Sequence, residues 1–253
     1  MTIIIKKWEG RLGNQIIQIR NAIQYALYYN HNLITPINVF TKNNKIIFNN
    51  KKNNNKLLSV RNNFFLKTIF TNNQIFKLNI NETKNILRKI FIFDYKLYEP
   101  LENDSILIHL RSGDLFTSPP GFGTKKYIIP PLEFFTNIID NNRYKKIYII
   151  SQDRKNPILK EIIRRYDRVI FRIQSLFEDI KMILRAKNII LSIGTFASSI
   201  LYFTEYTDNI YSTNYNINRI DKDFYNCNVN LFDYDSYYKM QGFWKNNNKQ
   251  RNL

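Results

Sequence analysis

The feature that most constrains the fold is an alternation of short apolar segments with helical segments between residues 106 and 204. The apolar segments have the length of buried strands and lie at residues 106–110, 146–151, 169–171 and 188–192. Segments with the apolar spacing of helices separate them or follow them, at residues 131–142, 157–166, 176–187 and 195–204. Strands that alternate with helices of these lengths predict βαβ units and therefore an α/β fold with a parallel sheet.

The N-terminal part predicts a strand at residues 3–6, a helix at 14–30 and a strand at 33–40. Residues 41–56 are rich in Asn and Lys and predict a solvated loop. Residues 57–93 mix short apolar runs with polar gaps, and their order stays open. Pro100 and three acidic residues precede the strand at 106–110 and mark a linker. We therefore expect an N-terminal lobe at 1–100, a C-terminal lobe at 101–243 and a disordered tail at 244–253.

Two polar loops follow predicted strands and stand out chemically. Residues 10–15 read Gly-Arg-Leu-Gly-Asn-Gln, and residues 109–114 read His-Leu-Arg-Ser-Gly-Asp. In an open α/β sheet, loops that follow strands lie at the carboxyl edge, where ligands bind. Arg111 offers a forked cation there that suits phosphate oxygens.

These loops belong to an ordered set of motifs that resembles the fucosyltransferase superfamily, in particular the α-1,2-fucosyltransferases and protein O-fucosyltransferases. That family has a G-x-L/F-G-N-Q loop near its start and an H-x-R-x-G-D loop about a hundred residues later. Residues 179–190 are similar to the family's D-L-x-x-M-x-x-C/A-K-H-x-I segment, and residues 194–197 follow where the family has N-S-T-F-S. Residues 151–153, Ser-Gln-Asp, are a weaker match to the family's S-D-D.

The resemblance implies two Rossmann-like lobes of the GT-B type, with the first lobe, on the acceptor side, trimmed because the chain has only 253 residues. It implies an inverting, metal-independent glycosyltransferase that transfers fucose from GDP-fucose to a glycan hydroxyl. The second lobe would bind the nucleotide sugar, and no cofactor is expected besides this donor substrate. Gly194 stands where the family has Ser, so the same scaffold using another deoxysugar nucleotide is an open alternative.

The resemblance also implies roles for individual residues. Arg111 would stabilise the leaving diphosphate, Asn14 would supply an amide at the reaction centre, and Glu9 is the best-placed carboxylate for a general base. The other residues expected to bind the donor are Gly13, Gln15, His109, Gly113, Asp114, Ser151, Asp153, Asp179, Gly194, Thr195 and Phe196.

Each of these residues also has a purely structural interpretation, and these alternatives stay open at the level of the sequence. Asn14 and Thr195 could cap helices, and Arg111 could be a surface arginine paired with Asp114. Asp179 could be an acid favoured at a helix start, and Glu9 could be a solvated loop acid.

The net charge of +18 raises the rival hypothesis of a nucleic-acid-binding protein. The basic residues are dispersed along an Asn- and Ile-rich chain, and no aromatic RNA-binding motif occurs, so we expect no specific nucleic-acid partner. A non-catalytic glycan- or RNA-binding module remains the alternative of another class.

Cysteine and histidine are scarce, with one Cys and two His in the chain, so neither an internal disulfide nor a zinc site is expected. No apolar run of membrane length is present. We therefore expect a cytoplasmic enzyme without a membrane span, whose partners are a nucleotide-sugar donor and a glycan acceptor.

Overall fold

The computed structural model describes residues 2–42, 44–46, 57–58, 79–117, 127–215, 221–242 and 244–251. The chain divides into two compact units, unit 1 at Met1–Tyr95 and unit 2 at Lys96–Leu253. The sequence places the lobe boundary a few residues later, at residue 100. Residues 118–126 of the expected functional loop lie outside the described residues, as do residues 59–78 of the segment whose order the sequence leaves open.

Unit 1 combines helices with a small sheet. The helices among its described residues are α1 (Leu12–Tyr28) and α2 (Ile80–Ile90). In the described part of the unit, the sheet consists of β1 (Thr2–Ile4), β2 (Asn32–Ile34), β3 (Lys45–Ile46) and β4 (Leu57–Leu58). The strand order is β3-β2-β1-β4, in which β1 runs parallel to β2 and β4 while β3 runs antiparallel to β2.

Helix α1 forms because its apolar residues recur at the spacing of one helical face. Ile16, Ile19 and Ile23 are fully buried, and they are separated by three and four residues. The helix begins at Leu12, two residues before the predicted start, so the Gly-Asn-Gln stretch forms its first turn. Helix α2, which the sequence left unassigned, packs against α1 with Leu87 and Ile90 buried.

Unit 2 contains a six-stranded parallel sheet in its described part. The strands are β5 (Ser105–Leu110), β6 (Lys146–Ser151), β7 (Val169–Phe171), β8 (Asn188–Leu191), β9 (Asn209–Thr213) and β10 (Asn228–Phe232). Their order is β10-β9-β8-β5-β6-β7, and every neighbouring pair is parallel. The prediction of an α/β fold with a parallel sheet is confirmed.

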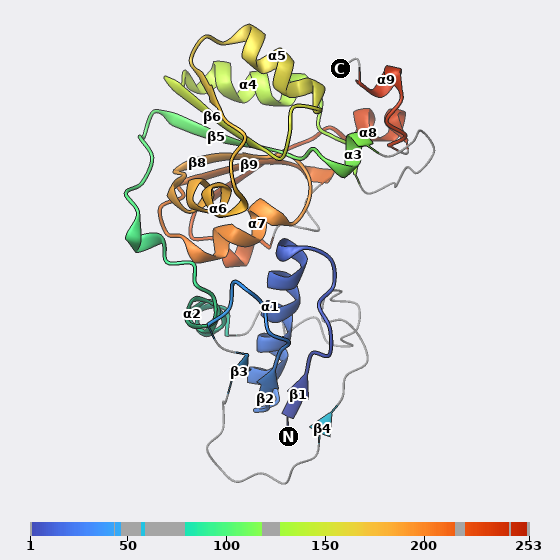
Figure 1. Ribbon diagram of the computed structural model, residues 1–253. Coiled ribbons are helices and arrows are strands. Elements are labelled where there is room, and N and C mark those ends of the chain that lie inside the picture. Colours follow the sequence, from blue (N-terminus) through green and yellow to red (C-terminus); the bar gives the residue numbers. More distant parts are fainter. Residues whose placement is uncertain are drawn as a thin grey trace. The chain divides into compact units, whose positions relative to one another are not determined.

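Helices cover both faces of this sheet. Helices α4 (Leu132–Asn142) and α5 (Pro157–Arg165) lie on one face, and α6 (Leu176–Arg185) and α7 (Phe196–Ile200) lie on the other (Figure 1). The shorter elements are η3 (Tyr95–Leu97), α3 (Asp114–Thr117), η4 (Leu201–Phe203), η6 (Lys222–Phe224), α8 (Asp235–Gln241) and α9 (Asn248–Arg251).

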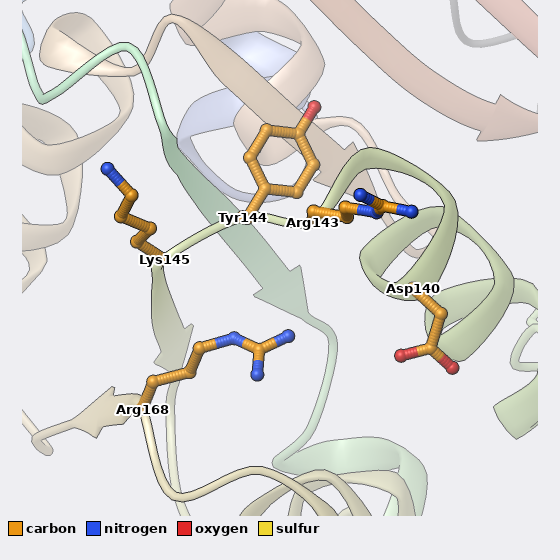
Figure 2. Close-up of a pocket in the computed structure, with 5 residues that line it drawn as sticks. All are labelled: Asp140, Arg143, Tyr144, Lys145 and Arg168. Carbon is orange, nitrogen blue, oxygen red and sulfur yellow. The ribbon is translucent and has the colours of Figure 1, made fainter.

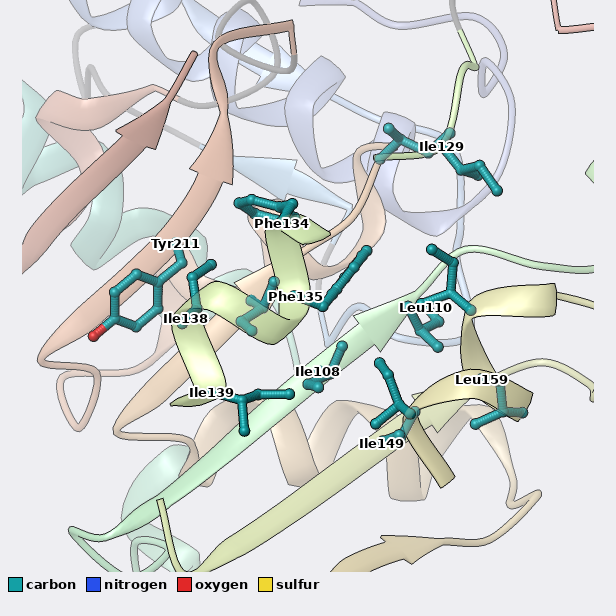
Figure 3. Close-up of a cluster of buried hydrophobic side chains, with 14 of the residues drawn as sticks. Ile108, Leu110, Ile129, Phe134, Phe135, Ile138, Ile139, Ile149, Leu159 and Tyr211 are labelled. Atoms are coloured by element: carbon teal, nitrogen blue, oxygen red, sulfur yellow. The ribbon is translucent and has the colours of Figure 1, made fainter. Parts of the chain in front are cut away.

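The core of unit 2 lies between the sheet and helices α4 and α5 (Figure 3). Ile108 and Leu110 alternate along β5 with His109, so they share one face and are at most 1 % exposed. Phe134 and Phe135 of α4 are fully buried in the same cluster. Burial of each such side chain stabilises the folded state by about 1.5–3 kcal/mol. The core therefore fixes the position of β5, and with it the start of the loop that follows.

The C-terminal region is more ordered than the sequence indicates. The ambiguous segment at 206–243 contains strands β9 and β10. Residues 244–251 are folded, which corrects the expectation of a disordered tail: Trp244 is 3 % exposed, and its Nε1 donates to the Leu115 carbonyl at 3.0 Å. The buried indole and the buried Gln250, whose Nε2 donates to the Gln241 carbonyl at 3.2 Å, hold this Asn- and Lys-rich segment, whose composition alone favours disorder.

The strand order creates a topological switch point. From β5 the chain adds β6 and β7 on one side, then returns to add β8, β9 and β10 on the other. This is the strand order of a Rossmann fold, in which ligands bind outside the carboxyl ends of the two strands where the direction reverses. Here those strands are β5 and β8. Within the described residues, no helix is long and apolar enough to cross a membrane.

Candidate functional site

The loops that follow β5 and β8 meet at the switch point, and Ser192 joins them. The Ser192 amide donates to the His109 carbonyl at 3.2 Å, and the Ser192 hydroxyl accepts from the Arg111 amide at 3.0 Å. Ser192 is 1 % exposed. The structure therefore brings together two of the motifs that the sequence singled out, through a serine that was not among the predicted site residues.

The side chain of Arg111 is partly exposed, and its nitrogen atoms differ in how they are bonded. Its Nη2 donates to both carboxylate oxygens of Asp114, at 2.7 and 3.0 Å, which fixes the plane of the guanidinium. Its Nε is buried and has no hydrogen-bond partner within the described part of the chain. A buried N–H without a partner is costly, so Arg111 is poised to donate to an acceptor that none of the described residues supplies.

His109 lies beside Arg111 on the face of β5 opposite the α4 core. Its ring centroid is 5.7 Å from that of Phe196, the first residue of α7. Burial, together with the positive charge of Arg111, lowers the pKa of His109 to about 3. The imidazole is therefore neutral at physiological pH, and it offers a ligand one donor and one acceptor rather than a charge.

The loop after β5 is tied to the loop after β6 through Asp153. The Asp153 carboxylate accepts hydrogen bonds from the Ser112 hydroxyl and, at 2.9 Å, from the Lys155 amide. Burial raises the pKa of Asp153, but the hydrogen bonds outweigh it and the pKa is lowered overall. Gly113 has φ +64°, a left-handed conformation that favours glycine. In the structure, Asp153 thus fixes the path of the Arg111 loop.

Asn156 makes a further connection that sequence reasoning missed. Its Nδ2 donates to the Arg111 carbonyl at 2.8 Å, and its Oδ1 accepts from the Ile158 amide at 3.0 Å. Asn156 is the N-cap of α5 and is 1 % exposed. The Asn-Pro pair at a helix start is the signal that identifies a cap in the sequence, although it does not reveal the second bond.

Four other predicted donor-binding residues lie at the same edge of the sheet. Ser151 ends β6, and its hydroxyl is buried without a partner in the described chain. Gly194 has φ +102°, and nothing lies within 4 Å of where a Cβ would stand. Thr195 and Phe196 begin α7, but this helix has only five residues. The helix-dipole attraction for phosphate expected there is consequently small.

Asp179 lies in the first turn of α6 and accepts a hydrogen bond from Gln174 Nε2 at 3.0 Å. Burial raises its pKa to about 6, against a lowering effect of Gln174. Because ionisation is unfavourable in the folded state, stability should fall as pH rises from about 4 to about 6 and stay lower above that range.

Replacing Asp179 with Asn should therefore stabilise the free protein near neutral pH by ~1 kcal/mol, a value discounted for partial exposure. Below about pH 4 the gain should vanish. Thermal unfolding near neutral pH and below about pH 4 measures the change in stability. Asp167→Asn, at an exposed position, is the control. An equal effect of Asp179→Asn at both pH values would rule out the burial argument.

The remaining predicted residues belong to unit 1. Gly10 takes φ +64° before α1, and a Cβ there would meet Asn14 Nδ2 at 2.3 Å. Gln15 is used structurally, since its Nε2 donates to the Gly10 carbonyl at 3.0 Å and its Oε1 accepts from Asn38. Gly13 is buried in the first helical turn. This network explains the Gly-x-x-Gly-Asn-Gln pattern as a way of building a tight turn into α1.

Glu9 precedes that turn and is partly exposed. Its carboxylate lies 3.6 Å from Lys7 Nζ, and its amide donates to Gln18 Oε1 at 3.2 Å. The backbone at Glu9 is therefore held against α1, while the side chain takes part in a surface ion pair of small energetic value.

Groups of three or more side chains able to hold a metal ion do not occur in the described ranges. Asp233 and Asp235, which form a D-x-D pattern, both accept hydrogen bonds from Asn214 Nδ2, at 2.9 and 2.7 Å. In comparisons with known proteins, no protein-family model and no curated protein matches the chain.

Proposed function

We propose that this chain is an inverting, metal-independent glycosyltransferase that transfers fucose from GDP-fucose to a glycan hydroxyl. The observation that carries the proposal is the position of Arg111, at the switch point of a Rossmann-type sheet and with a buried N–H that has no partner among the described residues. The two-lobed GT-B arrangement and the fucosyltransferase resemblance of the motifs are part of this proposal.

Arg111 suits a leaving diphosphate for three physical reasons. Its guanidinium is always charged and presents N–H groups in a fixed fork that matches phosphate oxygens. Asp114 holds that fork through two hydrogen bonds, so little entropy is lost when a ligand binds. As the sugar–phosphate bond breaks, negative charge grows on the diphosphate, and a cation already in place lowers the barrier.

His109 would complement this charge without adding to it. Because its pKa is about 3, the imidazole stays neutral beside Arg111 and can bond a ribose or phosphate oxygen as a neutral donor. Ser151 would supply a hydroxyl from the neighbouring strand β6, since that group also lacks a partner within the described chain.

The proposed transfer needs no reagent besides the donor and the acceptor. The acceptor hydroxyl oxygen attacks the anomeric carbon, and the bond from that carbon to the diphosphate oxygen breaks with inversion. The hydroxyl proton passes to a base, for which Glu9 is the candidate, and Asn14 would bind the acceptor by its amide. GDP leaves with the bonding electron pair.

The test is a thermal-shift screen with GDP-, UDP- and dTDP-sugars, followed by a transfer assay with the nucleotide that stabilises the protein most. We expect GDP-fucose to raise the unfolding temperature more than UDP-glucose does. Stabilisation by a dTDP-deoxysugar alone would favour the alternative donor. No shift with any sugar nucleotide, together with selective RNA binding, would support the binding-module hypothesis instead.

Transfer should persist in EDTA, because the Arg111 guanidinium supplies the positive charge that a divalent ion supplies in metal-dependent enzymes. The measurement is the initial rate with and without EDTA, and we expect less than a twofold change. Loss of activity in EDTA with recovery on adding Mn²⁺ would contradict this expectation. Asp233 and Asp235 would then be the candidate metal ligands.

A further inference from the structure

A pocket lies at the edge of the unit 2 sheet opposite the switch point. It has a volume of about 470 Å³ and is lined by Asp140, Arg143, Tyr144, Lys145 and Arg168 (Figure 2). These residues come from the end of α4, the turn into β6 and the turn before β7. They therefore surround the amino ends of two strands, whereas Arg111 follows the carboxyl end of β5. We call this the α4–β6 pocket.

Two of the charges that line the α4–β6 pocket are neutralised within the protein. The Asp140 carboxylate accepts a hydrogen bond from the Tyr166 hydroxyl at 2.8 Å and lies 3.8 Å from the Arg165 guanidinium. The Lys145 ammonium is 2.9 Å from the Asp104 carboxylate. In the view of Figure 2, the Lys145 ammonium points away from Arg168.

Arg143 and Arg168, by contrast, form no ion pair with any described residue. Arg168 packs its guanidinium over the Tyr166 ring, 5.1 Å from the centroid, and its Nε is buried without a hydrogen-bond partner among these residues. Leaving a buried donor unpaired costs about 1–3 kcal/mol. Arg143 is an exposed residue with φ +53°, a backbone conformation that is uncommon outside glycine. Two uncompensated guanidinium groups thus line one pocket.

We propose that the α4–β6 pocket binds a phosphate-bearing anion through Arg143 and Arg168. Phosphate oxygens match the forked geometry of guanidinium groups, and one of them would satisfy the buried Arg168 Nε. The volume of about 470 Å³ lies within the range of small-molecule sites and exceeds the need of a bare phosphate. The site is independent of the proposed transferase function, since it shares no residue with the switch point.

The test measures binding of inorganic pyrophosphate by calorimetry at physiological salt, in an Arg111→Gln background that disables the switch-point site. In this background we compare Arg143→Gln/Arg168→Gln with Lys160→Gln/Arg172→Gln. The second pair removes two exposed charges that do not line the pocket. Circular dichroism verifies that each variant is folded.

We expect pyrophosphate to bind the Arg111→Gln protein and the control variant equally. The pocket variant should bind at least tenfold more weakly, a difference of about 1.4 kcal/mol. Equal binding by the pocket and control variants would overturn the proposal, as would an absence of pyrophosphate binding by the Arg111→Gln protein. Either result would show that the two guanidinium groups form no site.

A second experiment identifies the source of the phosphate group. Vesicles of phosphatidylcholine with phosphatidylglycerol are sedimented with the wild-type protein and with the pocket and control variants. Loss of vesicle binding in the pocket variant alone would assign the anion to a lipid headgroup. If pyrophosphate binding depends on the pocket and vesicle binding does not, the ligand is a free phosphate compound.

Discussion

Replacing Arg111 with alanine is expected to lower the rate of sugar transfer by about 10²–10³-fold, which corresponds to about 2.7–4 kcal/mol of barrier. The physical reason is that Arg111 is a cation at the switch point, that Asp114 holds its guanidinium, and that its Nε has no hydrogen-bond partner in the described part of the chain. The change should leave the fold intact, because the Arg111 backbone contacts to Ser192 and Asn156 involve only its amide and carbonyl.

Arg111→Lys separates geometry from charge. A lysine keeps the positive charge but lacks the fork, so this variant should recover only a small part of the lost rate. The measurement is kcat/KM for the donor in the wild type, Arg111→Ala and Arg111→Lys. Arg172→Ala is a control at an exposed position. If the alanine variant keeps near-normal turnover, Arg111 does not act on the leaving group.

Replacing Asn156 with alanine is expected to cost ~2–4 kcal/mol of unfolding free energy. The side chain is 1 % exposed and makes two bonds, one capping α5 and one holding the Arg111 carbonyl. Alanine removes both bonds and leaves the carbonyl at the base of the Arg111 loop without that donor. Urea unfolding of the variant and the wild type measures the difference.

Ser175→Ala is the matched control for Asn156→Ala, because Ser175 caps α6 without contacting the Arg111 loop. We expect it to cost only about 1 kcal/mol. At a temperature where all three proteins are folded, Asn156→Ala should also weaken nucleotide binding, whereas Ser175→Ala should not. Equal stability losses in the two variants would show that the bond to the Arg111 carbonyl carries little energy.

The parallel sheet of unit 2 was predictable where strands are continuous apolar runs. Residues 106–108 of β5 are all apolar, and the helical spacing of α4, α5 and α6 is regular, so these elements agree with the prediction within a few residues. Strands β9 and β10 were not recognised, because Asn, Ser and Tyr interrupt their apolar pattern. Their pairing with each other, and that of β9 with β8, is seen only in the folded sheet.

Helix α2 and the C-terminal segment were missed for a similar reason. Helix α2 has four Ile and Leu residues among Asn, Lys, Glu, Thr and Arg, and residues 244–251 have one apolar residue, Trp244. Tertiary contacts therefore decide the structure of both. Trp244 shows this most clearly, since its indole is buried against the Leu115 carbonyl far away in the chain.

The candidate site was predictable in its charged and glycine residues but not in its supporting contacts. The positions of Arg111, His109 and Gly113 after a strand are visible in the sequence. Ser192 and Asn156, by contrast, act through backbone groups of the Arg111 loop that lie far away in the chain. Sequence spacing carries no information on such pairings.

The most direct test of the central claim, that the switch point between β5 and β8 binds a nucleoside diphosphate, is a calorimetric titration with GDP. The titration is made in the Arg143→Gln/Arg168→Gln background, in which the α4–β6 pocket should take up no diphosphate, and this protein should bind GDP at the switch point. Adding Arg111→Ala to this background should weaken binding roughly 10- to 100-fold, as expected for the loss of charge-assisted hydrogen bonds. Failure of the background protein to bind GDP, or equal affinity after adding Arg111→Ala, would contradict the claim.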